Sequence, residues 1–276
     1  MRYYQSDQYP IEFVWSENID KHFESHNHVG HYIISLVTQG VATVHLCEGQ
    51  CHADCGDARW MPDACDGKMD LHNNQYKCYK EDLFIIPPYV MHSVYQKKNT
   101  RLLSMCIGTS FVEETDYEAA ENILRDLLMY AVKQDVMTQE QGEKLRTAVR
   151  NVYCDREAVE KYRKEMDLGI KTLTDRLISY PEREFPIEAL AADIFVSKYY
   201  FLRKFKSSIG MSPHHFCIQN RIRKSQSLLN EEKTIGEISA EMGFYDQSHF
   251  NKAFRRIVGI SPSEYIRSKK KIQQAT

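Results

Sequence analysis

Residues 243–267 read GFYDQSHFNKAFRRIVGISPSEYIR, and part of this text occurs a second time in the chain. FRRIVGISPSEY at 254–265 aligns with FKSSIGMSPHHF at 205–216, at a shift of 49 residues, and the phenylalanine, the glycine and the Ser-Pro pair match outright. A repeat this short in a helical region indicates that one supersecondary unit was used twice. We therefore predict a C-terminal region built from two copies of the same helical unit.

The second copy carries local signals for two helices joined by a turn. Thr234 and Glu237 have the spacing of a capping box for a first helix. Gly243 suits the turn, and Asp246 is an N-cap for a second helix over about 247–257.

The first copy carries equivalent signals. Ser197 is an N-cap for a helix over 198–207, and Gly210 suits the left-handed residue that follows a helix end. Ser212 and Pro213 then begin a further helix, with the serine as the cap and the proline at the first helical position.

Two helices joined by a three- or four-residue turn form a helix-turn-helix, whose second helix enters the major groove of DNA. Phe201 and Phe205 in one copy, and Phe250 and Phe254 in the other, are spaced to face the core. The residues left facing outward are Tyr199, Leu202, Arg203 and Lys206 in the first copy and Gln247, His249, Asn251, Lys252 and Arg255 in the second.

The charge balance supports this interpretation. Residues 171–276 hold 18 Lys and Arg against 11 Asp and Glu, a net charge of +7, whereas residues 1–170 have a net charge of −9. A basic region of this kind is typical of a segment that meets a polyanion. The alternative is an ordinary helical bundle with a solvated basic face, and the repeat favours DNA binding over it.

The segment 243–267 resembles the signature of the AraC/XylS family of bacterial transcription regulators, and FPIEALAADIFVSKYYFLRKFKSSIGMSPHHF at 185–216 resembles that family's first helix-turn-helix. The resemblance implies two motifs in adjacent major-groove segments, bridged by a long helix over 214–229. It also implies double-stranded DNA and RNA polymerase as partners and a homodimer. The lack of a membrane span and of a secretory signal predicts a cytoplasmic protein.

By position in the motif, base edges would be approached by Tyr199, Leu202, Arg203, Gln247, His249 and Lys252. Arg and Gln suit bidentate contacts with guanine and adenine, while Lys206, Arg255 and Arg256 suit phosphates. Leu202 departs from the family pattern, in which this position is often polar, and it suits a thymine methyl group.

The N-terminal part, from about 11 to 112, reads as a series of strands, and residues 26–92 resemble the cupin-like barrel that binds an effector in many members of the family. HNHVGHYIISLVTQG at 26–40 and EDLFIIPPYVMHSV at 81–94 match the two cupin motifs. His26, His28 and His92 match three ligands of metal-binding cupins, whereas the glutamate is missing and His31 lies nearby. These histidines either line an effector pocket, which we favour, or hold a metal ion.

After the strand-like region, residues from about 116 to 180 have helical periodicity, with one apolar stripe over 123–131 and further helices over about 138–153 and 155–180. They either complete a core or form a linker and dimer interface. The expected fold is therefore multidomain α+β. A cupin-like antiparallel β-barrel at 1–112 is followed by the helical region at 113–170 and an all-α double helix-turn-helix domain at 171–276.

Residues 47–76 are an insertion where the cupin pattern has a short hairpin, and their cysteines are the candidate ligands of zinc or another divalent metal. A thiol redox switch and incidental cysteines remain as alternatives, although the acidic neighbours suit a cation better than a reactive thiolate. The four cysteines proposed as metal ligands are Cys47, Cys51, Cys55 and Cys65.

Several classes of protein are excluded by what the sequence lacks. No run approaches the ~18 apolar residues of a membrane span, and the N-terminus lacks the apolar core of a secretory signal. No catalytic triad or phosphate-binding glycine loop is present, so we expect no enzyme.

The sequence predicts a DNA-binding transcription regulator, an activator controlled by a small-molecule or metal effector. The alternatives are a metal or thiol sensor that uses the cysteine-rich insertion and a metal-dependent cupin enzyme.

Overall fold

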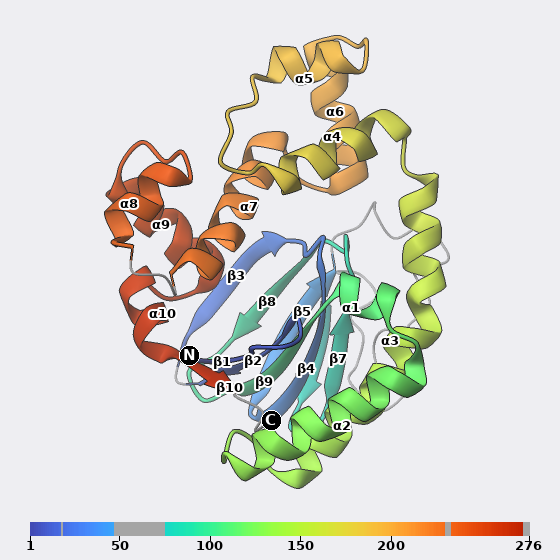
Figure 1. Cartoon of the computed structure of the whole chain (residues 1–276), viewed down its shortest axis with the longest axis vertical. Coiled ribbons are helices and arrows are strands. Elements are labelled where there is room, and N and C mark those ends of the chain that lie inside the picture. The colour runs from blue at the N-terminus through green and yellow to red at the C-terminus, as the bar shows by residue number, and fades with distance from the viewer. Residues whose placement is uncertain (18, 47–74, 230–232, 273–276) are drawn as a thin grey trace. The chain divides into compact units, whose positions relative to one another are not determined.

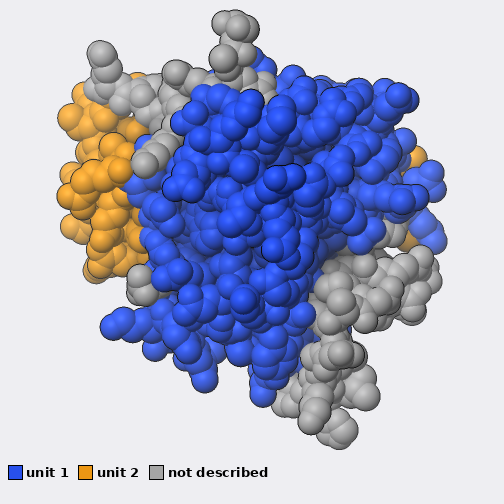
Figure 2. All heavy atoms as spheres, turned by 90° about the horizontal axis from the view of Figure 1, so that it is seen from below, with its two compact units in different colours: residues 1–161, 268–276 blue, residues 162–267 orange. Residues whose placement is uncertain are grey.

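The computed structural model describes residues 1–17, 19–46, 75–229 and 233–272, and the chain divides into two compact units (Figure 2). The N-terminal unit comprises Met1–Lys161 together with Ser268–Thr276, and the C-terminal unit comprises Tyr162–Arg267. The end of the chain, which we had placed with the DNA-binding region, thus returns to the N-terminal unit.

The N-terminal unit holds two β-sheets (Figure 1). One has the strand order β10-β1-β2-β9-β4-β7 and the other β3-β8-β5-β6. Strands β1 to β9 pair antiparallel in every ladder between them, while β10 pairs parallel with β1. The strand bounds are β1 Arg2–Ser6, β2 Ile11–Ser16, β3 Lys21–His26, β4 His31–Gln39, β5 Val41–Leu46, β6 Gln75–Tyr79, β7 Leu83–Ile86, β8 His92–Gln96, β9 Arg101–Gly108 and β10 Lys269–Ile272.

The antiparallel pairing of the N-terminal strands was predicted. The hydrogen-bonded ladders, however, do not join the described strands into one closed barrel. The described strands form two separate hydrogen-bonded sheets, and an apolar core that includes Val37 and Phe84 of one sheet and Val44 of the other lies between them. Gly40, at φ +76°, carries the chain from β4 into β5 of the other sheet. A Cβ there would lie 2.8 Å from the carbonyl oxygen of Asn99, so the turn has no room for a side chain.

Three helices cover the other face of the six-stranded sheet: α1 (Thr109–Glu114), α2 (Tyr117–Lys133) and α3 (Gln139–Glu165). The predicted apolar stripe is confirmed, since Leu124, Leu127 and Leu128 belong to the same buried cluster as Phe13 of β2. These helices therefore complete a core, as one of our two interpretations held. The predicted break near residue 154 is wrong, because residues 143–168 hold no glycine or proline to interrupt the helix. No helix in the described part of the chain is both long and apolar enough to cross a membrane.

The C-terminal unit is helical, and its core repeats with the sequence. Phe201, Phe205 and Phe216 pack edge to face at 5.7 and 5.6 Å between ring centroids. The residues 49 positions later, Phe250, Phe254 and Tyr265, contact one another in the same order, with both centroid distances at 5.6 Å. The helices are α4 Leu168–Ser179, α5 Ile187–Asp193, α6 Lys198–Ile209, α7 Pro213–Leu228, α8 Ile235–Glu241, α9 Gln247–Val258 and α10 Pro262–Ser268.

Candidate functional site

The two predicted recognition helices are α6 in the first copy (α5–α7) and α9 in the second (α8–α10). Both begin at the predicted residue, and they end two residues and one residue later than predicted. The Ser197 hydroxyl accepts a hydrogen bond from the Tyr200 N–H at 3.3 Å, and the Asp246 carboxylate accepts one from the His249 N–H at 2.6 Å. Gly210 and Gly259 end the helices in the left-handed conformation, with φ of 85° and 103°. The predicted capping box of Thr234 and Glu237 is also present in α8.

The turns that precede the recognition helices have the same backbone hydrogen bonds but different residues. Phe195 donates its N–H to Ala192 O, and Gly243 donates its N–H to Ala240 O, both at 3.0 Å. Each residue has a positive φ, 58° for Phe195 and 68° for Gly243. The Phe195 side chain is 96% exposed, so a bulky residue occupies a left-handed position without packing against anything.

Arg221 of α7 joins the second copy to the segment that precedes the first, and sequence reasoning missed it. Its guanidinium donates to the carbonyl oxygens of Pro181 at 2.8 Å, Gly243 at 2.7 Å and Arg183 at 3.1 Å. Because one rigid side chain holds three backbone carbonyls, α7 fixes the turn of the second motif directly. No local sequence signal identifies such a contact.

Most of the side chains predicted to face DNA are exposed. Tyr199, at 78% exposed, and Arg203, Lys206, Gln247, His249, Lys252 and Arg255 all lie on the surface of the unit. Leu202 and Asn251 differ, since both are half-buried, and the Oδ1 atom of Asn251 is buried with no hydrogen-bond partner in the described part of the chain. The His249 ring packs edge to face on Phe244 at 5.3 Å, which orients it at the start of α9.

The basic side chains of α6 separate into two groups by their partners. Lys198 pairs with Glu188 and Lys204 with Asp167, each at 2.6 Å, and the ammonium groups hold the pKa of both carboxyls below the usual value. Within the described ranges, Arg203 and Lys206 of α6 and Lys252 of α9 take part in no ion pair. These three cations are therefore not neutralised by the protein.

In the N-terminal unit, three of the four predicted histidines converge. His26 ends β3, His92 begins β8 opposite it, and His28 lies in the loop that follows β3. Their ring centroids are 4.4 to 5.2 Å apart, and the three side chains offer ring nitrogens that lie within 4.8 Å of one another. His31 is exposed, pairs with Gly108 at the start of β4 and does not join this group.

The cysteines proposed as metal ligands, Cys47, Cys51, Cys55 and Cys65, lie outside the described residues. The described strands define where the insertion joins the fold. Leu46, the last residue of β5, pairs with His92, and Gln75, the first residue of β6, pairs with His45. Both ends of the insertion therefore meet the four-stranded sheet that carries His26 and His92.

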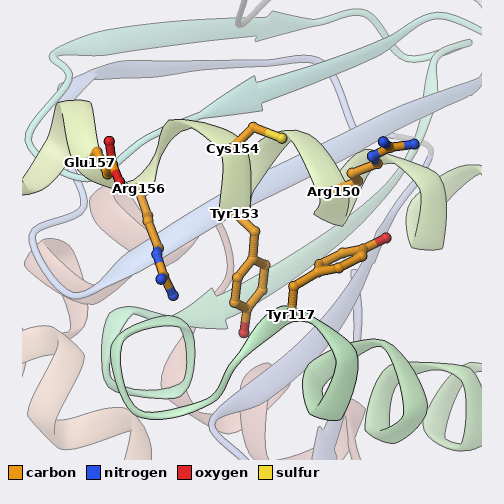
Figure 3. Close-up of a pocket in the computed structure, with 6 residues that line it drawn as sticks. All are labelled: Tyr117, Arg150, Tyr153, Cys154, Arg156 and Glu157. Carbon is orange, nitrogen blue, oxygen red and sulfur yellow. The ribbon is translucent and has the colours of Figure 1, made fainter.

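A surface cavity of about 530 Å³ lies between the start of α2 and α3 and is lined by Tyr117, Arg150, Tyr153, Cys154, Arg156 and Glu157 (Figure 3). In the described part of the chain the Tyr153 hydroxyl is buried without a hydrogen-bond partner, and burial raises its pKa to about 12. None of the lining residues was predicted as part of a site.

Comparison with known proteins identifies the class of the C-terminal unit. Residues 190–268 match the family described as "Helix-turn-helix domain". This match covers the whole second motif and the first motif from Leu190 onward, so the unit is a helix-turn-helix DNA-binding domain.

Two related proteins and one solved structure show which kind of helix-turn-helix protein this chain resembles. The HTH-type transcriptional regulator MtrA of Neisseria gonorrhoeae is 35% identical over 100 residues, which are 36% of this chain and 33% of MtrA. An HTH-type regulator of Haemophilus influenzae is 24% identical over 262 residues, 87% of each chain. ToxT of Vibrio cholerae has a similar fold, with a TM-score of 0.53, 12% identity and coverage of 97% of this chain and 99% of ToxT. The chain carries the DNA-binding domain of the AraC/XylS family.

Proposed function

We propose that this protein is a sequence-specific transcription regulator that binds double-stranded DNA through α6 and α9. The observation that carries the proposal is the pair of capped helices on one repeated core. Within the described residues, α6 carries two exposed cations outside any ion pair, Arg203 and Lys206, and α9 carries one, Lys252. Such cations suit guanine edges and phosphates. We also propose, from the family resemblance, that the protein contacts RNA polymerase and activates transcription, and that it acts in the cytoplasm.

The test is DNA binding by the full-length protein to the region upstream of its own gene, measured at several salt concentrations. Loss of a side chain that reads a base, as in Arg203→Ala, should weaken binding by about 1–3 kcal/mol and relax the preference for one sequence. Loss of a phosphate contact, as in Lys206→Ala, should weaken binding to all sequences and reduce the salt slope by about 0.9.

Arg125→Ala supplies the matched control, because Arg125 is an exposed arginine of α2 in the N-terminal unit. It changes the net charge by the same amount and should leave DNA binding unchanged. If wild type and Arg203→Ala bind every DNA fragment with equal affinity, α6 does not read sequence and the proposal fails.

We propose further that an effector bound by the N-terminal unit controls this DNA binding, with His26, His28 and His92 in its site. The convergence of three imidazoles from two strands and a loop supports this assignment, and His31 is left out of it. A homodimer formed through residues 113–170 would place two DNA-binding domains on neighbouring half-sites. Sedimentation of the full-length protein, with and without DNA, measures this directly.

The alternative of a metal-dependent enzyme has less support. Within the described residues, no Asp or Glu joins the group of three histidines. The alternative of a sensor that uses the cysteine-rich insertion rests on sequence alone. Among the described residues, the group of three histidines is a better candidate for a metal site than the cysteine-rich insertion, because its side chains converge.

A further inference from the structure

Two aromatic side chains in the turns between α5 and α6 and between α8 and α9 (Figure 1) are almost fully exposed. Phe195 is 96% exposed and precedes Ser197, the N-cap of α6, by two residues. Tyr245 is 93% exposed and comes directly before Asp246, the N-cap of α9. Each copy of the repeated unit therefore presents an aromatic ring to solvent at the beginning of its recognition helix.

The backbone of Phe195 is strained, and the fold does not compensate for the strain. Its φ of 58° lies in the left-handed region, which is unfavourable for a residue with a bulky side chain. Other residues with a positive φ in the described ranges differ. Tyr89 is buried, at 7% exposed, and the Glu81 carboxylate pairs with Lys144. Asp135 is of a residue type that tolerates this conformation. Uncompensated strain of this kind is typical of residues that act in binding.

The surroundings of the two rings indicate which partner covers them. Within the described residues, Arg203 and Lys206 of α6 and Lys252 of α9 take part in no ion pair, so the partner is a polyanion. In helix-turn-helix complexes the N-terminal end of the recognition helix is the end that meets the base edges. A ring at this end of α6 or α9 therefore faces DNA and not a second protein.

We propose that Phe195 and Tyr245 contact DNA, Phe195 through a thymine methyl group and Tyr245 through a backbone phosphate. The thymine methyl is the apolar group that base edges present in the major groove, and phenylalanine is among the residues that pack against it. Tyrosine is among the residues that donate to phosphate oxygens. Leu202, which was predicted to suit a thymine methyl group, is half-buried and offers less apolar surface than Phe195. Phe195 thus contributes to sequence preference, whereas Tyr245 contributes to affinity for any sequence.

This assignment rests on the proposed function, because it requires α6 and α9 to bind DNA. It gives a reason for a phenylalanine in the strained turn. Glycine at position 195 would relieve the left-handed conformation but would remove the ring. Stability and DNA binding therefore favour different residues at this position, and the two properties are measured separately.

The first experiment measures the affinity of the full-length protein for the DNA upstream of its own gene. Phe195→Gly and Phe195→Ala both remove the ring, whereas only Phe195→Gly also removes the Cβ that strains the turn. We expect both variants to bind about tenfold more weakly than wild type, although Phe195→Gly is the more stable protein in urea denaturation. An equal loss of affinity in the two variants assigns the effect to the ring and not to the backbone.

Tyr79→Ala is the matched control, because Tyr79 is an aromatic residue of β6 in the N-terminal unit and is 48% exposed. It removes an exposed ring and should leave the affinity for DNA unchanged. Wild-type affinity in both Phe195 variants would overturn the contact. If Arg203→Ala weakens binding in the same assay and the Phe195 variants do not, the proposed function stands and this assignment fails. If wild type binds no DNA, the proposed function itself fails.

Substitution of thymine by deoxyuridine tests the methyl group directly. Each thymine of the bound DNA is replaced in turn, which removes one methyl group and keeps the hydrogen bonds of the base pair. At the thymine that Phe195 contacts, wild type should lose affinity about fourfold, as expected for burial of one methyl group. Phe195→Gly should bind the two DNAs equally. If no substitution separates wild type from Phe195→Gly, the contact with a thymine methyl group is overturned.

Tyr245→Phe tests the phosphate contact of the second copy, because it removes the hydroxyl and keeps the ring. We expect about tenfold weaker binding to every sequence, the loss that one hydrogen bond to a charged group gives. The salt dependence should stay as in wild type, since a neutral hydroxyl releases no counterion. Wild-type affinity in Tyr245→Phe would overturn this contact.

Discussion

The two helix-turn-helix copies share a core and differ in their turns. Both place three aromatic residues in the same order, and both end their recognition helix at a left-handed glycine. In the second copy the turn residue is Gly243, which the backbone of Glu182 and the Arg221 guanidinium approach closely. In the first copy the equivalent residue is Phe195, which is almost fully exposed. A left-handed turn therefore requires glycine only where another part of the fold packs against it.

The largest expected effect comes from removing the contact that distinguishes the second copy. Arg221→Met keeps the length and apolar stem of the side chain but removes three hydrogen bonds from a charged donor. We expect a loss of about 3 kcal/mol in the free energy of unfolding, since each such bond contributes about 1.5–3 kcal/mol and they are not additive. Urea denaturation of the full-length protein measures it. Lys224→Met, an exposed change on the same helix, should cost less than about 0.5 kcal/mol.

The next effect concerns the glycine of the second turn. In Gly243→Ala the new Cβ would lie 2.9 Å from the Glu182 carbonyl oxygen and 3.4 Å from Arg221 Cζ, at a φ of 68°. We expect a loss of about 2 kcal/mol, from the left-handed conformation and the steric contact together. Gly236→Ala in α8 is the control, because a Cβ there meets only ordinary contacts at 3.4 Å and beyond, and alanine favours a helix. Equal losses in the two variants would contradict the explanation.

The opposite sign is expected at the first turn. Phe195→Gly relieves a left-handed conformation that costs a residue with a side chain about 1–2 kcal/mol, and little packing is lost because the ring is exposed. Part of this gain is offset by the larger entropy of the unfolded chain, so we expect a net stabilisation of about 0.5–1 kcal/mol. Phe195→Ala keeps the Cβ and should change the free energy of unfolding little. If glycine and alanine behave alike at position 195, φ is not the cause.

The smallest effect concerns a further difference between the copies. In the alignment of the two copies, His214 of α7 corresponds to Ser263 of α10. Burial, followed by the nearby positive groups His215, Arg221, His249 and Arg256, lowers the pKa of His214. A histidine whose folded-state pKa is lowered stabilises the fold above its ordinary pKa of about 6.5, and that contribution is lost as the pH falls below it. The Tm of wild type should therefore fall more between pH 7 and pH 5 than that of His214→Gln. Parallel pH profiles of the two proteins would contradict this.

The parts of the fold that follow local rules were predictable. The caps at Ser197, Thr234 and Asp246 and the left-handed Gly210 were assigned from spacing alone, because a cap is a contact between residues three apart. Arg221 was not predictable, since its acceptors lie 22 to 40 residues away in the chain. The left-handed turn residue of the first copy was not predictable either, because such positions are usually glycine and this one is Phe195.

In the candidate effector site, too, the features set by neighbouring residues were predictable and those set by distant residues were not. The spacing of His26 and His28 was visible in the sequence, whereas the approach of His92 depends on the pairing of β3 with β8 and came only from the resemblance to cupins. His31 was included because it lies nearby in the sequence, but it starts the next strand and belongs to the other sheet. The division into two sheets, and the return of the chain end to one of them, depend on long-range ladders that no local pattern records.

The strand β10 has a consequence for how the protein behaves in a crowded solution. An unpaired edge strand is a template on which other chains assemble, and without β10 the strand β1 would be such an edge. The segment that covers it contains three consecutive lysines, Lys269, Lys270 and Lys271. By pairing with β1, β10 removes that edge from the six-stranded sheet, so β1 offers no unpaired template to another chain.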